Sequence, residues 1–346
     1  MELKVSIIGA TGYTGVELLR LLAGHSEVEV VAITSESSTG SSIADIYPHL
    51  LTHYSDKLTN MAAMEDIAAA SDVVFIALPH GHAMEAGKKI AAVGTKLIDL
   101  GADYRFKDPA VYEKWYKVPH THQDAVAVYG LTELYRDEVK TAAIVGNPGC
   151  YTTASILALA PLVKFGLVEL NTIVVDAKSG VSGAGRSLAL GSHFTEVFED
   201  VKAYNIGGHR HTPEIEQALT EVAGTDVMIS FTPHLIPMAR GILSTCYASL
   251  KPGVTAEQVD EAYQALYGSE YFIRLLGRGA YPRTKQTRGS NFCDLGWHVD
   301  KRTNRVVAVS AIDNLVKGAA GQAVQNMNVM LGLDEKLGLT QAPLYP

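Results

Sequence analysis

The sequence predicts an α/β protein of two domains: a doubly wound parallel sheet, followed by an α+β domain whose sheet is mixed or antiparallel. In the first third of the 346-residue chain, short β-branched runs alternate with stretches of helical spacing, which is typical of parallel strands joined by helices. A glycine-rich turn follows the first of these strands. After residue 150, long apolar strands follow one another with fewer helices between them, which favours antiparallel pairing.

Composition and charge narrow the class of protein. The chain is 47% hydrophobic and 19% charged, and its length suits about two domains. Its formal net charge of −8 argues against a nucleic-acid partner. No stretch approaches the roughly 18 apolar residues of a membrane span, and no signal peptide is recognisable. We therefore expect a cytoplasmic protein with neither a membrane nor a nucleic-acid partner.

The first domain is expected at residues 1–149 together with 313–346. Its predicted strands cover residues 4–10, 27–33, 72–78, 96–100 and 142–146, and its predicted helices include residues 13–23 and 83–93. The second domain is expected at residues 150–312, with strands at residues 172–177, 227–233 and 241–250 and a strand ending near 312. An alanine-rich helix over residues 315–331 then returns to the first domain.

The glycine-rich turn GATGYTG places Gly9, Gly12 and Gly15 between the first strand and the first helix. Glycines there allow a tight turn and a close approach of a pyrophosphate to the free N–H groups of the helix. The spacing is G-x-x-G-x-x-G, so its position carries more weight than the motif itself. The alternative is a turn that binds no ligand. We expect a Rossmann-type dinucleotide-binding domain.

The end of the second strand indicates which dinucleotide is bound. An acidic residue at this point usually holds the 2′-hydroxyl of NAD, whereas here the chain reads AITSESSTG. Ser35 and Ser37 can donate hydrogen bonds to a 2′-phosphate, and Glu36 would have to face away from it. The sequence therefore favours NADP over NAD.

Cys150 is a candidate nucleophile in the segment GNPGCYTTASILALAP. It follows a buried strand at the carboxyl edge of the sheet and begins a helix, whose dipole and free N–H groups stabilise a thiolate. The same N–H groups could stabilise an oxyanion. The alternative is an inert, buried cysteine, and we expect that for Cys246 and Cys293. Three widely spaced cysteines suit a reducing compartment, and we expect no metal site.

The segment GGHRHTPEIEQAL carries His209, Arg210 and His211 just before a helix that Thr212 is expected to cap. A histidine on such a rigid but open mount suits general acid–base catalysis. The alternative is a surface loop without a chemical role.

Two further loops follow strand ends. GADYRF carries Arg105, which could bind an anion, and KSGVSGAGR could let a ligand approach the backbone closely. Arg240 lies beside a proline-containing turn. Together with a dinucleotide, a thiol and a histidine, these arginines suggest a cysteine-dependent aldehyde dehydrogenase that acts on an acyl phosphate or a carboxylate-bearing substrate.

Seven motifs in this order resemble the N-acetyl-gamma-glutamyl-phosphate reductase family, which is related to the aspartate-semialdehyde dehydrogenases. The resemblance runs from Lys4 to about Leu331, and its motifs are GATGYTG, GADYRF, GNPGCY, SGVSGAGR, HRHTPEI, FTPHLIPMARGIL and AIDNLVKGAAGQAVQ. It implies an NADPH-dependent enzyme of arginine biosynthesis that passes through a cysteine thioester and forms a homo-oligomer, a dimer or a tetramer. One departure is Thr152, where the family usually has proline or alanine.

The resemblance also implies roles for individual residues. Cys150 would be the nucleophile and His211 the acid–base, with His209 as the second choice. Substrate would be held by Arg105, Asn147, Ser179, His209 and Arg240. The cofactor would be held by Gly9, Thr11, Gly12, Tyr13, Thr14, Gly15, Ser35, Ser37, Pro79, Gly180, Ser182 and Asn314.

Three alternatives remain open. The same chemistry could act on an N-acylated aminoadipyl phosphate of lysine biosynthesis, because one methylene is worth only about 1–3 kcal/mol of discrimination. The chain could be a non-catalytic NADP-binding regulator, which predicts cofactor binding without a reactive thiol. It could also be a cysteine hydrolase built on Cys150 and His211, although we identify no Asn or Asp to orient the histidine.

Overall fold

The computed structural model describes residues 2–55, 57–61 and 64–346. The chain divides into two compact units, Met1–Pro148 with Ala319–Thr340 and Gly149–Gly318 with Gln341–Pro346. Compared with the expected division, residue 149, residues 313–318 and residues 341–346 fall in the second unit instead of the first. The backbone N–H of Leu344 donates to Arg288 O, and this hydrogen bond holds the chain end on the second unit.

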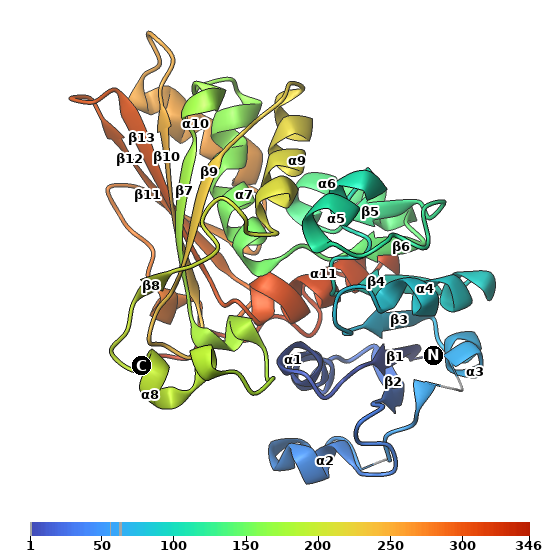
Figure 1. Cartoon of the computed structure of the whole chain (residues 1–346). Coiled ribbons are helices and arrows are strands. Elements are labelled where there is room, and N and C mark those ends of the chain that lie inside the picture. Colours follow the sequence, from blue (N-terminus) through green and yellow to red (C-terminus); the bar gives the residue numbers. More distant parts are fainter. Residues whose placement is uncertain (1, 56, 62–63) are drawn as a thin grey trace. The chain divides into compact units, whose positions relative to one another are not determined.

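The first unit is built on a six-stranded sheet whose strands are all parallel, in the order β2-β1-β3-β4-β6-β5 (Figure 1). The order reverses beside β1, and in such sheets ligands bind at the carboxyl ends of the strands on either side of the reversal. The predicted doubly wound sheet is confirmed. Its strands are β1 (Leu3–Ile8), β2 (Val28–Thr34), β3 (Val73–Ile76), β4 (Lys96–Asp99), β5 (Ala127–Tyr129) and β6 (Ile144–Gly146).

Helices cover both faces of this sheet. α11 packs against α1, α6 and β4, whereas α3 and α4 pack against each other. Parallel strands are joined by right-handed crossovers. The connections that lead to β2 and β6 run across the sheet in the opposite direction to those that lead to β3 and β4, so their helices lie on the opposite face. The helices are α1 (Tyr13–Leu22), α2 (Ile43–Ile46), α3 (Met64–Ala69), α4 (Ala83–Ala92), α5 (Pro109–Tyr116), α6 (Thr132–Thr141) and α11 (Gly321–Met330).

The second unit has a seven-stranded mixed sheet in the order β11-β12-β13-β10-β7-β9-β8 (Figure 1). Parallel pairing occurs between β11 and β12 and between β7 and β9, and the other pairs are antiparallel. The expectation of a mixed sheet is therefore confirmed. Its strands are β7 (Val174–Ser179), β8 (Lys202–Ala203), β9 (Ser230–Leu235), β10 (Ile242–Ser249), β11 (Ile273–Arg278), β12 (Cys293–Asp300) and β13 (Arg305–Ile312).

The helix that begins at Cys150 is the centre of the second unit. α7 (Cys150–Lys164) packs on β10 and β13 and contacts α9 (Thr212–Ala223) and α10 (Ala256–Tyr267). Every residue from Tyr151 to Val163 is buried, so the helix is enclosed on all sides, as expected of a core helix. This burial makes its first turn a rigid mount. One short helix, α8 (Phe194–Val197), lies in the segment between β7 and β8.

The helix predicted over residues 315–331 begins with a π-helical turn, Val316–Ala320, before α11. The N–H of Gly318 donates to Asp313 O, five residues earlier. A Cβ on Gly318 would lie 2.8 Å from the Cβ of Cys150, so only glycine allows this approach. Within the described residues, none of the helices combines the length and the apolar character needed to cross a membrane.

Candidate active site

The three glycines of the first turn have different roles. Gly9 has φ +83°, and a Cβ there would lie 2.8 Å from the O atom of Ala77, the residue that follows β3. A Cβ on Gly15 would lie 2.6 Å from Ala10 O, so this glycine lets α1 pack on the turn. Gly12, the N-cap of α1, has open space where its Cβ would be. A phosphate can therefore approach the helix N-terminus at Gly12, and the turn fits a dinucleotide.

Hydroxyl groups gather at the end of β2. The Oγ of buried Ser35 lies 3.3 Å from Thr11 Oγ1 and 3.5 Å from Ser37 Oγ. Glu36 is exposed, and its carboxylate accepts a hydrogen bond of 2.8 Å from the N–H of Met61. This strand end therefore offers neutral donors to a ligand. The other predicted cofactor residues of this unit are Tyr13 and Thr14, half-buried in the first turn of α1, and Pro79, exposed in the loop after β3.

Arg105 is held by backbone carbonyl groups. Its Nε donates to Asn147 O at 2.7 Å and its Nη2 to Leu100 O at 3.1 Å, and the side chain is 6% exposed. Asn147 is fully buried, and its amide donates to Ala319 O and accepts from Asn326 Nδ2, each at 3.0 Å. The backbone oxygen of Asn147 thus helps to hold Arg105, and the substrate contact expected of Asn147 stays a prediction.

Two buried aspartates, which sequence reasoning missed, shape the same region. Asp103 accepts hydrogen bonds from the N–H groups of Gly81 and Ala83 and from the Tyr112 hydroxyl, at 2.8 to 3.0 Å. It thereby ties the loop after β3 to the segment that carries Arg105. Burial, together with the nearby Asp103, raises the pKa of the Asp99 carboxyl to about 7. In the sequence, the only sign that Asp99 and Asp103 could matter was their position near the end of a strand.

The structure distinguishes Cys150 from the other two cysteines. Cys150 is the first residue of α7 and is half-buried, whereas Cys246 and Cys293 are buried. Burial raises the pKa of the Cys246 thiol to about 12, so this group stays protonated and unreactive at neutral pH. Gly149 caps the helix with an extended backbone. Cys150 is therefore the one accessible thiol at a helix N-terminus.

The histidine loop lies against the first turn of α7. Ring centroids of Tyr151 and His209 are 5.7 Å apart, those of Tyr151 and His211 are 6.0 Å apart, and the two histidines are 4.8 Å apart. The structure therefore brings both predicted histidines beside the residue that follows Cys150. The sequence predicted Thr212 as the N-cap of α9. In the structure the N-cap is His211, because His211 O accepts the hydrogen bond from Ile215 N.

His209 and His211 differ in what they can do. Burial, with a smaller effect of the Arg210 charge, lowers the pKa of His209 to about 4. Its Nδ1 accepts a hydrogen bond from the N–H of His211 at 3.1 Å, so the neutral ring carries its hydrogen on Nε2. At pH 7 the ring of His209 is therefore mostly neutral. This favours His211 as the proton donor.

His209 should make the fold sensitive to acid. Its pKa in the folded state lies below the unfolded value of 6.5, so the unfolded chain binds the extra proton and stability falls as pH drops from about 6.5 to about 4. Replacing His209 by Asn should remove about 1–3 kcal/mol of this loss. Urea unfolding of both proteins at pH 7 and at pH 4.5 measures the difference. Equal losses in the two proteins would contradict the prediction, and His193→Asn, at an exposed histidine, is the control.

The small-residue loop after β7 is held against the segment that carries Arg240. A Cβ on Gly180 would lie 2.9 Å from Ala239 O, and Ser182 N donates to the same carbonyl. The amide of Asn314 accepts from Gly241 N at 2.7 Å and donates to Ser182 Oγ at 3.0 Å. Ser182, Asn314 and Arg240 thus lie together. Buried Ser179 donates to Gly180 O, and Arg240 Nη1 lies 3.5 Å from Asp313 Oδ2.

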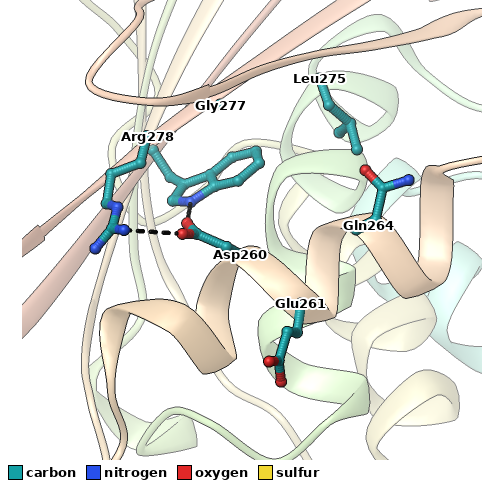
Figure 2. A pocket seen from close by; sticks show the side chains of 7 residues that line it. Asp260, Glu261, Gln264, Leu275, Gly277 and Arg278 are labelled. Atoms are coloured by element: carbon teal, nitrogen blue, oxygen red, sulfur yellow. Dashed lines mark hydrogen bonds and ion pairs between the residues drawn. The ribbon is translucent and has the colours of Figure 1, made fainter.

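Two pockets of the second unit contain none of the predicted site residues. One, of about 340 Å³, adjoins the same loop and is lined mainly by apolar side chains, among them Val181, Phe194, Phe198 and Met238. The other, of about 380 Å³, lies between α10 and the strands β11 and β12. There Asp260 accepts a hydrogen bond from the Trp297 indole and pairs with Arg278 (Figure 2). In this pocket Asp260 is therefore bound by two of the other lining side chains.

Comparison with known proteins gives the class first. Residues 4–142 match the semialdehyde dehydrogenase NAD binding domain, and residues 150–314 match the semialdehyde dehydrogenase dimerisation domain. Aspartate semialdehyde dehydrogenase II from Vibrio cholerae has the same fold, with a TM-score of 0.72, 18% identity and coverage of 96% and 99% of the two chains. The enzyme from Candida albicans, solved with NADP, gives a TM-score of 0.70. Fold and site thus define a semialdehyde dehydrogenase.

Relatives of higher identity define the family. The N-acetyl-gamma-glutamyl-phosphate reductases of Pelotomaculum thermopropionicum and Symbiobacterium thermophilum are each 55% identical to this chain over the full length of both proteins. The chain belongs to the N-acetyl-gamma-glutamyl-phosphate reductase family. The resemblance predicted from the sequence motifs is confirmed.

Proposed function

We propose that this protein reduces N-acetyl-gamma-glutamyl phosphate to N-acetylglutamate 5-semialdehyde with NADPH, releasing phosphate, as a step of arginine biosynthesis. The observation that carries the proposal is the accessible thiol of Cys150 at the N-terminus of α7, with the histidine loop against the same turn. The relatives that share 55% of its sequence bear the name of this reductase.

The reaction follows from these groups. The Cys150 thiolate attacks the acyl carbon, the C–O bond to phosphate breaks, and a thioester forms. NADPH, when bound, would supply the hydride that reduces this thioester. His211 donates a proton during the collapse to aldehyde and thiol, and free N–H groups at the start of α7 stabilise the oxyanion. Arg105, fixed by its backbone contacts, holds the phosphate.

NADP is the cofactor that suits the first unit. Ser35 and Ser37 supply hydroxyl groups at the end of β2, and the carboxylate of Glu36 is bound to Met61 N. A 2′-phosphate there meets donors and no aspartate, which is the arrangement expected for NADP binding. Gly12 gives the pyrophosphate room at α1, and Gly180, Ser182 and Asn314 are assigned to the nicotinamide.

The assembly and the location are part of the proposal. Residues 150–314 match a domain described as a dimerisation domain, and we assign the protein to a homo-oligomer. Among the described residues the three cysteines form no disulfide bond, which suits the reducing cytoplasm.

The reverse reaction tests the proposed function. We expect N-acetylglutamate semialdehyde, phosphate and NADP to yield NADPH absorbance only when all three are present. Arsenate, which replaces phosphate in acyl transfer, should also support turnover. Turnover with only the longer N-acylated aminoadipate semialdehyde would replace the substrate by that of lysine biosynthesis. NADP binding without turnover of either substrate would indicate a regulator.

A further inference from the structure

Glu214 is a buried carboxylate that links the two parts of the candidate active site in the second unit. It lies in the first turn of α9, three residues after His211, and its side chain is 0% exposed. Its Oε1 accepts a hydrogen bond of 2.8 Å from the N–H of Gly149, the residue before Cys150. An acidic residue in a first helical turn usually serves its own helix, but this one binds the start of α7.

Thr152 adds a second link to the same oxygen atom. Its hydroxyl lies 2.9 Å from Glu214 Oε1 and 2.5 Å from Gly149 O, so its hydrogen is shared between the two. The hydroxyl of Thr152 therefore adds a contact between α7 and α9.

We propose that Glu214 is a positioning residue for the Cys150 thiol, and that Thr152 strengthens this role in the present chain. The carboxylate fixes the N-cap of α7 and ties it to the helix whose own N-cap is His211. The thiol and the imidazole are then held by one buried hydrogen-bonded junction. Small displacements of reacting groups are costly, since about 1 Å can lower a rate by about 100-fold.

The inference rests on the proposed function, because it takes Cys150 as the nucleophile, but it can be tested apart from turnover. The test uses the full-length protein and three variants: Glu214→Ala removes the junction, Glu214→Gln keeps an oxygen acceptor, and Thr152→Val removes only the hydroxyl. Asp294→Asn is the matched control, because Asp294 is a buried carboxylate of the same unit that pairs with Arg274. NADP binding and thermal melting verify that each variant is folded.

Two measurements are made on each variant. One is the rate at which iodoacetamide alkylates Cys150 at pH 7, followed by peptide mass. The other is kcat and KM in the reverse reaction. In Glu214→Ala we expect kcat to fall about 100-fold and alkylation to slow about tenfold, because the frayed turn stabilises the thiolate less well. The KM for NADP should change less than about twofold, since the cofactor turn lies in the first unit.

Partial rescue is the result that separates positioning from mere stability. Glu214→Gln should keep kcat within about fivefold of the original protein, and Thr152→Val should lower it about three- to fivefold, as loss of one hydrogen bond implies. Unchanged alkylation and kcat in Glu214→Ala would overturn the proposal. Faster alkylation in both Glu214 variants would also overturn it, because the carboxylate would then act only as a charge opposing the thiolate.

The remaining outcomes are also decisive. If Glu214→Ala does not fold, Thr152→Val decides, and unchanged alkylation and kcat in that variant overturn the proposal. Turnover in a Cys150→Ala variant would reject the proposed function, whereas the alkylation rates would still report on Glu214.

Discussion

A Cys150→Ala variant is expected to lose phosphate-dependent NADPH formation by at least about 10,000-fold, the scale seen when a covalent nucleophile is removed. Without the thiol no thioester forms, and the acyl phosphate would have to be reduced without covalent capture. NADP binding should persist, because the glycine turn and the serines at the end of β2 belong to the first unit. A spectrophotometric assay in both directions, with cofactor titration by fluorescence, measures the two quantities separately.

Cys246→Ala is the control for this variant. Cys246 is buried in β10, and its thiol stays protonated at neutral pH, so its loss should change kcat by less than about threefold while lowering stability through the small cavity that it leaves. Residual turnover of Cys150→Ala above about 1% of the original would show that Cys150 is not the nucleophile. Equal losses in the two variants would point to a folding defect.

The alternation of strands and helices made the fold of the first unit predictable from the sequence. The strands expected around residues 4–10, 72–78 and 96–100 are close to β1, β3 and β4, because buried parallel strands are continuous apolar runs. The three-residue strand β5 (Ala127–Tyr129) was missed. So short a strand carries no periodic pattern, and its pairing with β6 depends on residues distant in the sequence.

The second unit was less predictable in its details. Its mixed sheet was expected, but β11 and β12 were not assigned. The first residues of β12 are all buried, so they do not show the alternation of buried and exposed residues that marks a surface strand. Gly296 also interrupts the apolar run of this strand. The N-cap of α9 was placed one residue too late, since Thr212-Pro213 is a common helix start and His211 is an unusual cap. Tertiary contacts with Tyr151 place that histidine.

The candidate site was predictable where chemistry depends on local sequence. Cys150 after a Pro-Gly turn and the histidines before α9 were identified because each precedes a recognisable helix. Glu214 and Asp103 were missed because their partners are distant: Glu214 binds Gly149, 65 residues away, and Asp103 binds Gly81, 22 residues away. A buried carboxylate in a first helical turn looks like an ordinary helix-stabilising residue until its partners are known.

The two histidines should respond differently to substitution. His211→Asn is expected to lower kcat by about 100- to 10,000-fold, the usual contribution of a general acid. Asparagine is also among the best N-cap residues, so α9 keeps its start and the loss reports on proton transfer. His209→Asn should lower kcat only about tenfold, because the neutral ring of His209 supports the N–H of His211 and is scarcely protonated at pH 7.

The pH dependence of kcat decides between the two assignments. In the unmodified protein, the fall of kcat at low pH should not have an apparent pKa of about 4. His209 titrates there, whereas the proton donor must be protonated near neutral pH. In His211→Asn most of the rate of the reductive direction should be lost at every pH, whereas His209→Asn should keep the pH profile of the unmodified protein. A larger loss in His209→Asn than in His211→Asn would exchange the roles. His209 would then have to gain its proton although burial, the main cause of its low pKa, opposes the charged ring.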